Sequence, residues 1–170
     1  MQLESFIRDI PDFPKKGIIF KDITPLLLDP GAFDAALQNM ILPYADRCVD
    51  KVLAIESRGF IFGGAMARQL GCGLVLARKP GKLPAETIQE EYTLEYGTNS
   101  LEVHTDSIRE NDRVVIVDDL LATGGTALAA VNLVERLKGR VRGLEFLIEL
   151  DFLDGREKIR EYTVHSQLHY

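Results

Sequence analysis

The sequence of 170 residues contains no tryptophan, only two cysteines and only three histidines. Cys48 and Cys72 show no metal-ligand spacing, and two isolated thiols need not form a disulfide. Reduced thiols are the default in cytoplasmic proteins, so the cytoplasm is the expected location. None of the histidines falls in a recognisable motif, and we expect surface or packing roles for them.

Long apolar runs and clusters of positive charge are also missing. No segment approaches the length of a transmembrane helix, and the first residues, Met-Gln-Leu-Glu-Ser, lack the charged and apolar regions of a signal peptide. The formal net charge is −6, and no basic run creates a local surface for nucleic acid. We therefore expect neither nucleic acid nor membrane as a partner. A polyanionic substrate would have to be bound by a few placed cations, backbone amides and Mg²⁺.

The residues that are present are typical of one globular domain, with 46% hydrophobic and 27% charged residues. Strand-like and helix-like patterns alternate along the chain. They predict a single domain over 1–170 of the α/β class, with a mostly parallel, twisted sheet of about five strands flanked by helices. The expected strands are 51–55, 73–79, 114–117, 141–151 and 162–168. The expected helices are 2–10, about fifteen residues from Pro30, 59–70, 126–138 and 154–161.

The chain is organised around residues 114–127, Val-Val-Ile-Val-Asp-Asp-Leu-Leu-Ala-Thr-Gly-Gly-Thr-Ala. The β-branched run predicts a strand buried on both faces, and Asp118 and Asp119 follow where ligands bind in open α/β sheets. The Thr-Gly-Gly-Thr turn then leads into a helix that begins near Thr126. Its amides and hydroxyls are suited to a phosphate, and the acids can accept hydrogen bonds from sugar hydroxyls.

Taken alone, this turn is better explained as an ordinary strand–helix turn with a helix cap. It is not a Walker A loop, because no Gly-Lys-Ser/Thr follows. The paired acids change the interpretation, since burying two like charges is costly unless partners or a metal offset them. The combination indicates a sugar-phosphate site.

A second strand, turn and helix occupies residues 51–70, with Glu-Ser-Arg-Gly-Phe at 56–60. Arg58 can bind a phosphate through two parallel N–H bonds, with Ser57 assisting. An isolated arginine is more often part of a surface ion pair. Beside the first turn, a second anion site at a strand end is the better interpretation.

Two further stretches are irregular. Residues 12–25 form a hydrophobic loop in which Phe20 can stack on a flat ring, although packing in the core is the commoner role from composition alone. Residues 85–104 alternate loosely and predict a projecting hairpin with a turn at 97–99 and Glu-Tyr-Gly at its tip, 95–97. Such a hairpin is a candidate lid that excludes water. A solvated edge hairpin is the alternative.

Together these motifs resemble those of the type I phosphoribosyltransferases that act on adenine, and the resemblance spans nearly the whole chain. The family's phosphoribosyl-diphosphate signature, pyrophosphate loop, interface segment, catalytic flap and adenine hood are similar to residues 114–127, 56–60, 78–84, 94–97 and 12–25, respectively. The resemblance implies purine salvage: transfer of the phosphoribosyl group from 5-phosphoribosyl 1-diphosphate to N9 of adenine, giving AMP and diphosphate. It also implies a hood at about 1–28 and a flap at about 82–106.

The resemblance implies a role for each site residue as well. The ribose 5-phosphate group would be bound by Asp118, Asp119, Ala122, Thr123, Gly124, Gly125 and Thr126. The diphosphate would be bound by Ser57, Arg58 and Arg78, and adenine by Ile19, Phe20 and Lys21. The catalytic residues would be Arg58, Glu95 and Tyr96.

Arg58 would stabilise the leaving group, Glu95 would handle a proton at the base, and Tyr96 would help close the lid. Mg²⁺ would be held mainly through the substrate, with no direct protein ligand. Arg78 would serve the site of a partner subunit, which implies a homodimer.

Two positions in the sequence bear on which purine base the enzyme would use. Relatives that act on 6-oxopurines usually carry an aspartate at the position of Ala122, so this alanine favours a 6-aminopurine. Adenine-specific members often have arginine where this chain has Lys21, which leaves a side-chain contact to the base open. The alternatives are a 6-oxopurine enzyme and a non-catalytic nucleotide-sensing regulator on the same fold. Ala122 argues against the first, and the acidic charge with Arg58 and Glu95 against the second.

Overall fold

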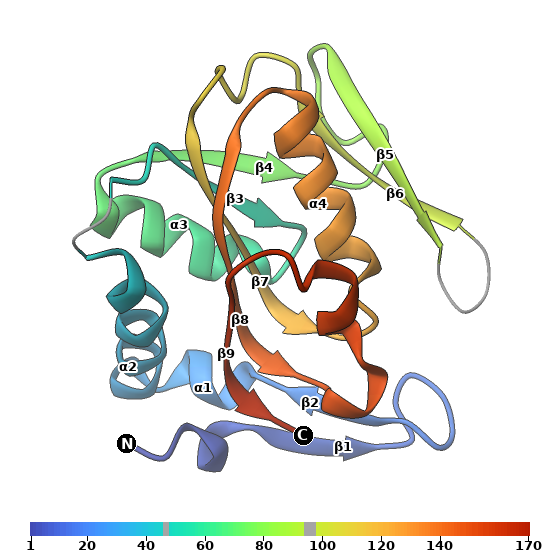
Figure 1. Ribbon diagram of the computed structural model, residues 1–170. Helices are drawn as coiled ribbons and strands as arrows, with labels where there is room; N and C mark the ends of the chain where they lie inside the picture. Colours follow the sequence, from blue (N-terminus) through green and yellow to red (C-terminus); the bar gives the residue numbers. More distant parts are fainter. Residues whose placement is uncertain (46–47, 94–97) are drawn as a thin grey trace. The chain divides into compact units, whose positions relative to one another are not determined.

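The structure, a computed structural model, describes residues 1–45, 48–93 and 98–170 (Figure 1). The chain forms two compact units, Met1–Asn39 and Met40–Tyr170, and each is considered by itself. In the described part of the chain, no helix is both long and apolar enough to cross a membrane. The expected hood, residues 1–28, falls in the first unit.

The first unit contains a small antiparallel sheet that the sequence analysis missed. Its elements are η1 (Leu3–Phe6), β1 (Arg8–Pro11), β2 (Ile19–Asp22) and α1 (Thr24–Leu28), and α2 (Pro30–Ile41) runs on into the second unit. The helix predicted over 2–10 is wrong, because residues 8–11 pair with residues 19–22. Ion pairs join the two strands, from Arg8 to Asp22 at 2.6 Å and from Lys21 to Asp9 at 2.7 Å. These cross-strand partners outweigh the helical spacing of the apolar residues.

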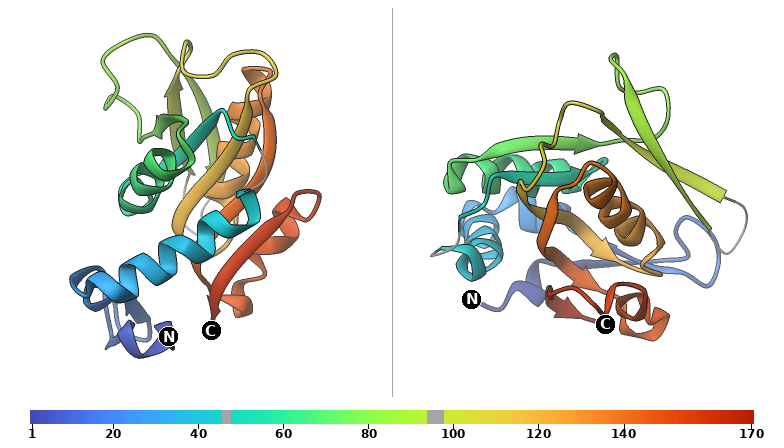
Figure 2. Two further views of the ribbon diagram at one scale, coloured as in Figure 1. Left: turned by 90° about the vertical axis from the view of Figure 1, so that its left-hand side faces the viewer. Right: turned by 45° about the horizontal axis from the view of Figure 1, so that its top comes forward.

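The second unit is built on a five-stranded sheet in which every neighbouring pair is parallel, which confirms the predicted core. The strand order is β4 (Gly73–Ala77), β3 (Lys51–Ile55), β7 (Arg113–Leu121), β8 (Arg140–Glu149) and β9 (Val164–His169). Helices α3 (Gly59–Leu70) and α4 (Gly125–Arg136) lie on opposite faces of this sheet (Figure 2). Consecutive residues of β3 pack on opposite faces of the sheet. Leu53 belongs to the core cluster that includes α4, whereas Ala54 packs against Gly63 of α3.

The remaining elements of the second unit surround this sheet. They are η2 (Leu42–Tyr44), the hairpin β5 (Thr87–Thr93) and β6 (Thr98–His104), η3 (Asp151–Leu153) and η4 (Gly155–Ile159). The predicted hairpin is confirmed and extends away from the sheet (Figure 1). Its base is fixed to α4, since Arg136 Nη1 donates to the Gln89 carbonyl at 2.6 Å and pairs with Glu90 at 2.9 Å.

Several predicted boundaries need correction: α2 has twelve residues, not fifteen, and the last two strands of the sheet span Arg140–Glu149 and Val164–His169. Thr98 and Asn99, expected in the hairpin turn, belong to β6, and residues 94–97 lie outside the described part of the chain. The helix expected over 154–161 is a shorter 3₁₀ helix, η4. The strand expected over 73–79 ends at Ala77, although Arg78 still makes a bridge to Glu102 of β6.

Candidate active site

A cleft of about 400 Å³ opens at the carboxyl ends of β3 and β7 in the second unit. Its lining residues are Ile55, Glu56, Ser57, Arg58, Lys79, Tyr92, Leu101, Asp118, Asp119, Leu120, Ala122 and Thr126. The two strands are parallel neighbours, so the turns that follow them meet at one edge of the sheet. The structure thereby brings together residues that the sequence places about sixty positions apart.

The two acids are held differently, although they are adjacent in β7. The Asp119 backbone N–H donates to Asp118 Oδ1 at 2.8 Å, and Arg58 Nε lies 2.6 Å from Asp119 Oδ2. Burial and, second to it, the neighbouring charge of Asp119 raise the pKa of the Asp118 carboxyl. Burial raises the pKa of Asp119 as well, but the charge of Arg58 beside it works in the opposite direction. Asp118 is therefore the acid that more readily carries a proton.

The turn after β7 brings backbone amides to the cleft. Helix α4 begins at Gly125, one residue before the expected Thr126, and Gly124 precedes it with φ of +76°. A side chain at Gly124 is excluded on two grounds, because this backbone conformation is left-handed and a Cβ would lie 2.2 Å from the Gly155 carbonyl oxygen. Ala122 and Thr126 line the cleft, and Thr123 and the two glycines form the turn between them. The amides at this helix start are suited to an anion.

The turn after β3 forms the other wall. Arg58 directly precedes α3, and Gly59 packs so closely that a Cβ would lie 2.9 Å from the Val117 carbonyl oxygen. This approach brings the start of α3 next to β7. Ser57 and Arg58, which the sequence assigned to an anion site, both line the cleft, and their binding of an anion stays a prediction.

Glu56 and Lys79 also line the cleft, although the sequence analysis gave neither of them a role of its own. The Glu56 carboxylate accepts hydrogen bonds from the Lys79 amide at 2.9 Å and from Arg78 Nε and Nη2, both at 3.3 Å. Burial works against this charge, but these bonds outweigh it and lower the pKa of Glu56. Arg78 also donates to the Lys82 carbonyl at 3.2 Å, so its guanidinium is held beside the cleft wall. The sequence did offer an indication for Lys79, because it is the second of two cations at the end of the strand predicted over 73–79.

The other predicted site residues fall elsewhere. Glu95 and Tyr96 lie outside the described residues. Ile19, Phe20 and Lys21 form part of β2 in the first unit, where the Phe20 ring makes an edge-to-face contact with Phe13 at a centroid distance of 5.2 Å. Their assignment to adenine stays a prediction.

One carboxylate–histidine group outside the cleft has ligand atoms spaced for a cation: Glu149, Asp151 and His169, within 4.8 Å of one another. Arg156 already pairs with Glu149, so a cation there would face a positive charge. In the cleft, Asp118 and Asp119 offer the hard oxygen atoms that Mg²⁺ prefers. Because Asp119 is already paired and Asp118 is hydrogen-bonded, this donor set fits an ion held mainly by substrate oxygens and water.

Comparison with known proteins agrees with this geometry. Residues 32–165 match the family model of the phosphoribosyl transferase domain. An adenine phosphoribosyltransferase of Halothermothrix orenii is 55% identical over 168 residues, 99% of either chain. That of Thermotoga neapolitana is 54% identical over 170 residues, the whole of both chains.

Solved structures agree as well. The adenine phosphoribosyltransferase of Thermoanaerobacter pseudethanolicus superposes with a TM-score of 0.96 at 54% identity, covering 99% of this chain and 98% of that one. The Saccharomyces cerevisiae enzyme, complexed with D-2,5-dideoxy-2,5-imino-altritol 1,6-bisphosphate and adenine, gives 0.93 at 38% identity, covering 98% and 97%.

The parallel sheet, the acid pair and the glycine turn at its carboxyl edge define a type I phosphoribosyltransferase fold. The chain belongs to the phosphoribosyltransferase family, and within it to the adenine phosphoribosyltransferases. The family resemblance and the fold class predicted from the sequence are confirmed.

Proposed function

We propose that this enzyme acts in purine salvage and transfers the phosphoribosyl group of 5-phosphoribosyl 1-diphosphate to N9 of adenine, releasing AMP and diphosphate. The observation that carries the proposal is that one cleft combines three features: the acid pair Asp118 and Asp119, the turn at residues 122–126, and the turn that contains Arg58. The full-length similarity to adenine phosphoribosyltransferases supports the choice of base.

The proposed chemistry matches the charges of the cleft. Breaking the C1′–O bond leaves positive charge on the ribose ring and negative charge on the departing diphosphate. Arg58, Ser57 and the amides at the start of α3 stabilise the diphosphate. The amides of residues 122–126, with the hydroxyls of Thr123 and Thr126, hold the 5′-phosphate and so align C1′.

Asp118 and Asp119 receive the 2′- and 3′-hydroxyls of the ribose. Their negative charge beside the ring also favours the positive charge that develops there. When bound with the substrate, Mg²⁺ supplies further neutralisation of the leaving group.

The remaining roles in the proposal rest on the family pattern. Ile19, Phe20 and Lys21 bind adenine, Glu95 handles the proton at the base, and Tyr96 helps to exclude water. Ala122 lines the cleft and has no carboxylate, which supports adenine over a 6-oxopurine.

The proposal includes a cytoplasmic homodimer in which Arg78 serves the partner's diphosphate. Exposed apolar side chains gather on α3 and on β4, an edge strand: Ile61 is 42%, Leu74 43% and Leu76 38% exposed. Such a surface is suited to a second copy. Reduced thiols at Cys48 and Cys72 fit the cytoplasm. Sedimentation of Leu74→Lys should show monomers where the wild-type chain shows dimers, and a wild-type monomer would refute this part.

The test of the function is a product assay with radiolabelled base, 5-phosphoribosyl 1-diphosphate and Mg²⁺. Adenine, hypoxanthine, guanine and xanthine are compared under the same conditions. We expect labelled AMP from adenine and little product from the other three. Absence of nucleotide from every base would refute transferase activity, and faster use of hypoxanthine than adenine would refute the specificity.

A further inference from the structure

Residues 122–126 of the second unit form the turn proposed to bind the 5′-phosphate, here called the phosphate turn. Residues 154–156, which are distant in the sequence, lie against it. A Cβ on Gly155 would lie 2.1 Å from the Ala122 carbonyl oxygen and 2.8 Å from the Gly124 nitrogen, and one on Gly124 would lie 2.2 Å from the Gly155 carbonyl oxygen. The two backbones therefore touch with no side chain between them. The turn cannot shift toward this side unless residues 154–156 also move.

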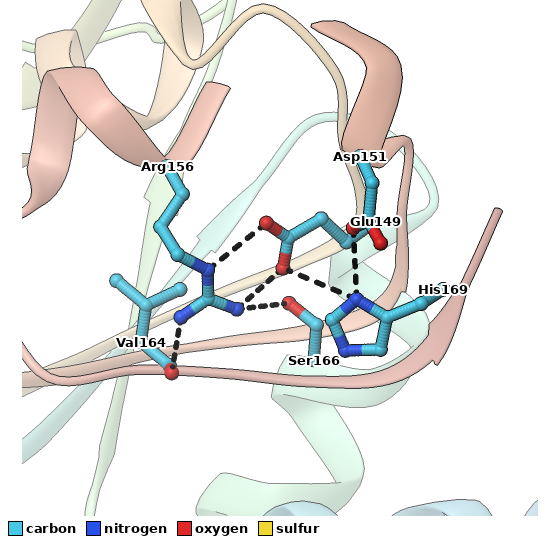
Figure 3. A network of polar contacts seen from close by, with 6 residues as sticks. All are labelled: Glu149, Asp151, Arg156, Val164, Ser166 and His169. Atoms are coloured by element: carbon cyan, nitrogen blue, oxygen red, sulfur yellow. Dashed lines mark hydrogen bonds and ion pairs between the residues drawn. The ribbon is translucent and has the colours of Figure 1, made fainter. Parts of the chain in front are cut away.

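Arg156 fixes this segment to the sheet (Figure 3). Its guanidinium pairs with Glu149 through both carboxylate oxygens, with Nε at 3.0 Å from Oε1 and Nη2 bonded to Oε2. It also donates to the Val164 carbonyl at 2.8 Å and to Ser166 Oγ at 3.3 Å. One side chain thus joins η4 to the end of β8 and to β9, and a bidentate pair fixes orientation as well as distance.

Glu149, the partner of Arg156, is itself held in place by the surrounding structure. Glu149 is only 5% exposed, and its backbone carbonyl accepts the Tyr170 amide at 3.0 Å. The next residue, Leu150, donates its amide to the Leu121 carbonyl at the end of β7, at 2.9 Å. At the far end of η4, Ile159 is fully buried in the core. Residues 154–156 are therefore fixed from both directions.

We propose that Gly155 and Arg156 are positioning residues of the phosphoribosyl site: Arg156, held by Glu149, presses the Gly155 backbone against residues 122–124 and so sets the turn for the 5′-phosphate. This inference rests on the proposed function for the identity of the ligand. Neither residue is among those that line the cleft. Their influence therefore reaches the substrate only through the turn.

The proposal predicts selective damage to one substrate. Gly155→Ala places a methyl group against Ala122 without requiring a left-handed backbone, because φ of Gly155 is not positive. We expect KM for 5-phosphoribosyl 1-diphosphate to rise about tenfold or more, since small displacements of positioned groups have large effects. KM for adenine should stay unchanged. The control is Gly73→Ala at the start of β4, where a Cβ meets only the flexible end of Lys51.

Arg156→Gln tests the same claim by removing the ion pair with Glu149 that holds residues 154–156. Its matched control is Arg113→Gln, because Arg113 forms an equally bidentate pair with Asp50 at the start of β7, the end of the sheet away from the cleft. Both variants should lower the melting temperature, and only Arg156→Gln should raise KM for 5-phosphoribosyl 1-diphosphate. If Arg156→Gln fails to fold, Gly155→Ala decides the matter. Equal changes in the two KM values, or kinetics like those of the controls, would overturn the proposal.

A binding measurement separates this inference from the proposed function. Calorimetric titration with ribose 5-phosphate needs no turnover. Weaker binding to Gly155→Ala than to Gly73→Ala would support the positioning role even if the wild-type chain formed no AMP. Equal binding to both variants, in an enzyme that does form AMP, would refute the positioning role alone.

Discussion

Arg58 Nε lies 2.6 Å from Asp119 Oδ2, which ties the turn after β3 to the acid pair of β7. Arg58 precedes α3, while Asp119 is a buried residue of the neighbouring strand. The same ion pair therefore offsets the charge of a buried acid and fixes the cation that we assign to the diphosphate. The ion pair thus connects the proposed diphosphate site to the proposed site for the ribose hydroxyls.

The first prediction concerns this cation. Arg58→Ala should lower kcat/KM by about a hundredfold or more, because a preorganised charge at the leaving group is lost. Arg58→Lys should recover only part, since lysine lacks the planar fork. Far-ultraviolet circular dichroism should show that the fold persists. Kinetics of Arg58→Ala equal to those of wild type would mean that the diphosphate binds elsewhere.

The second prediction concerns the two acids. Asp118→Asn should weaken binding of 5-phosphoribosyl 1-diphosphate yet stabilise the fold at neutral pH, because it removes one of two adjacent negative charges, of which Asp119 is buried. The pKa of Asp118 is raised in the folded state, so its ionisation lowers wild-type stability as pH rises. The advantage of the variant should therefore grow with pH. Urea unfolding at pH 5 and pH 8 measures it, and a pH-independent difference would contradict the assignment.

The third prediction tests the proton carrier. Glu95→Gln should reduce kcat by about a hundredfold or more if Glu95 handles the proton at the base. Glu91→Gln is the control, because Glu91 is an exposed acid of β5 in the same hairpin. Steady-state rates with adenine decide the case, and activity of Glu95→Gln within a few-fold of wild type would remove it from this role.

The fourth prediction is a pH dependence away from the cleft. Glu145 is buried in β8, where its Oε1 accepts the Tyr44 hydroxyl at 2.8 Å and lies 2.6 Å from His165 Nδ1. Burial raises the pKa of Glu145 to about 7, although both hydrogen bonds work in the opposite direction. The folded protein therefore holds a proton that the unfolded chain releases above its ordinary carboxyl pKa of about 4.3.

The proton on Glu145 therefore adds to the free energy of unfolding. This contribution is complete below the pKa that Glu145 has in the unfolded chain, and it is lost as the pH rises through about 7. The shift of the pKa limits this contribution to the unfolding free energy to at most about 4 kcal/mol. Glu145→Gln keeps an acceptor for Tyr44 and cannot ionise. Unfolding free energies measured from pH 4.5 to 7.5 should fall more steeply for wild type than for the variant. Parallel curves would show that Glu145 titrates normally.

Much of this molecule follows from local pattern. Unbroken β-branched runs such as Val114–Val117 predict the buried strands, and the rule for parallel sheets predicts that the anion site at Arg58 lies beside the turn after residues 114–117. The turn chemistry of residues 122–126 likewise needs only the local sequence. These features depend on residues close in the chain or on a general rule of topology.

The missed features depend on distant partners. Arg8–Pro11 has helical spacing, but its strand forms because residues 19–22 lie opposite with complementary charges. The support of the phosphate turn by Gly155 and the burial of Glu145 arise from packing between segments far apart in sequence. An isolated glycine or glutamate gives no local signal of such a partner.

A crystal structure with Mg²⁺, 5-phosphoribosyl 1-diphosphate and an unreactive adenine analogue tests the central claim most directly. The 5′-phosphate should lie on the amides of residues 123–126, the ribose hydroxyls on Asp118 and Asp119, and the diphosphate at Ser57 and Arg58. A sugar phosphate bound in the reverse direction, or outside this cleft, would contradict it.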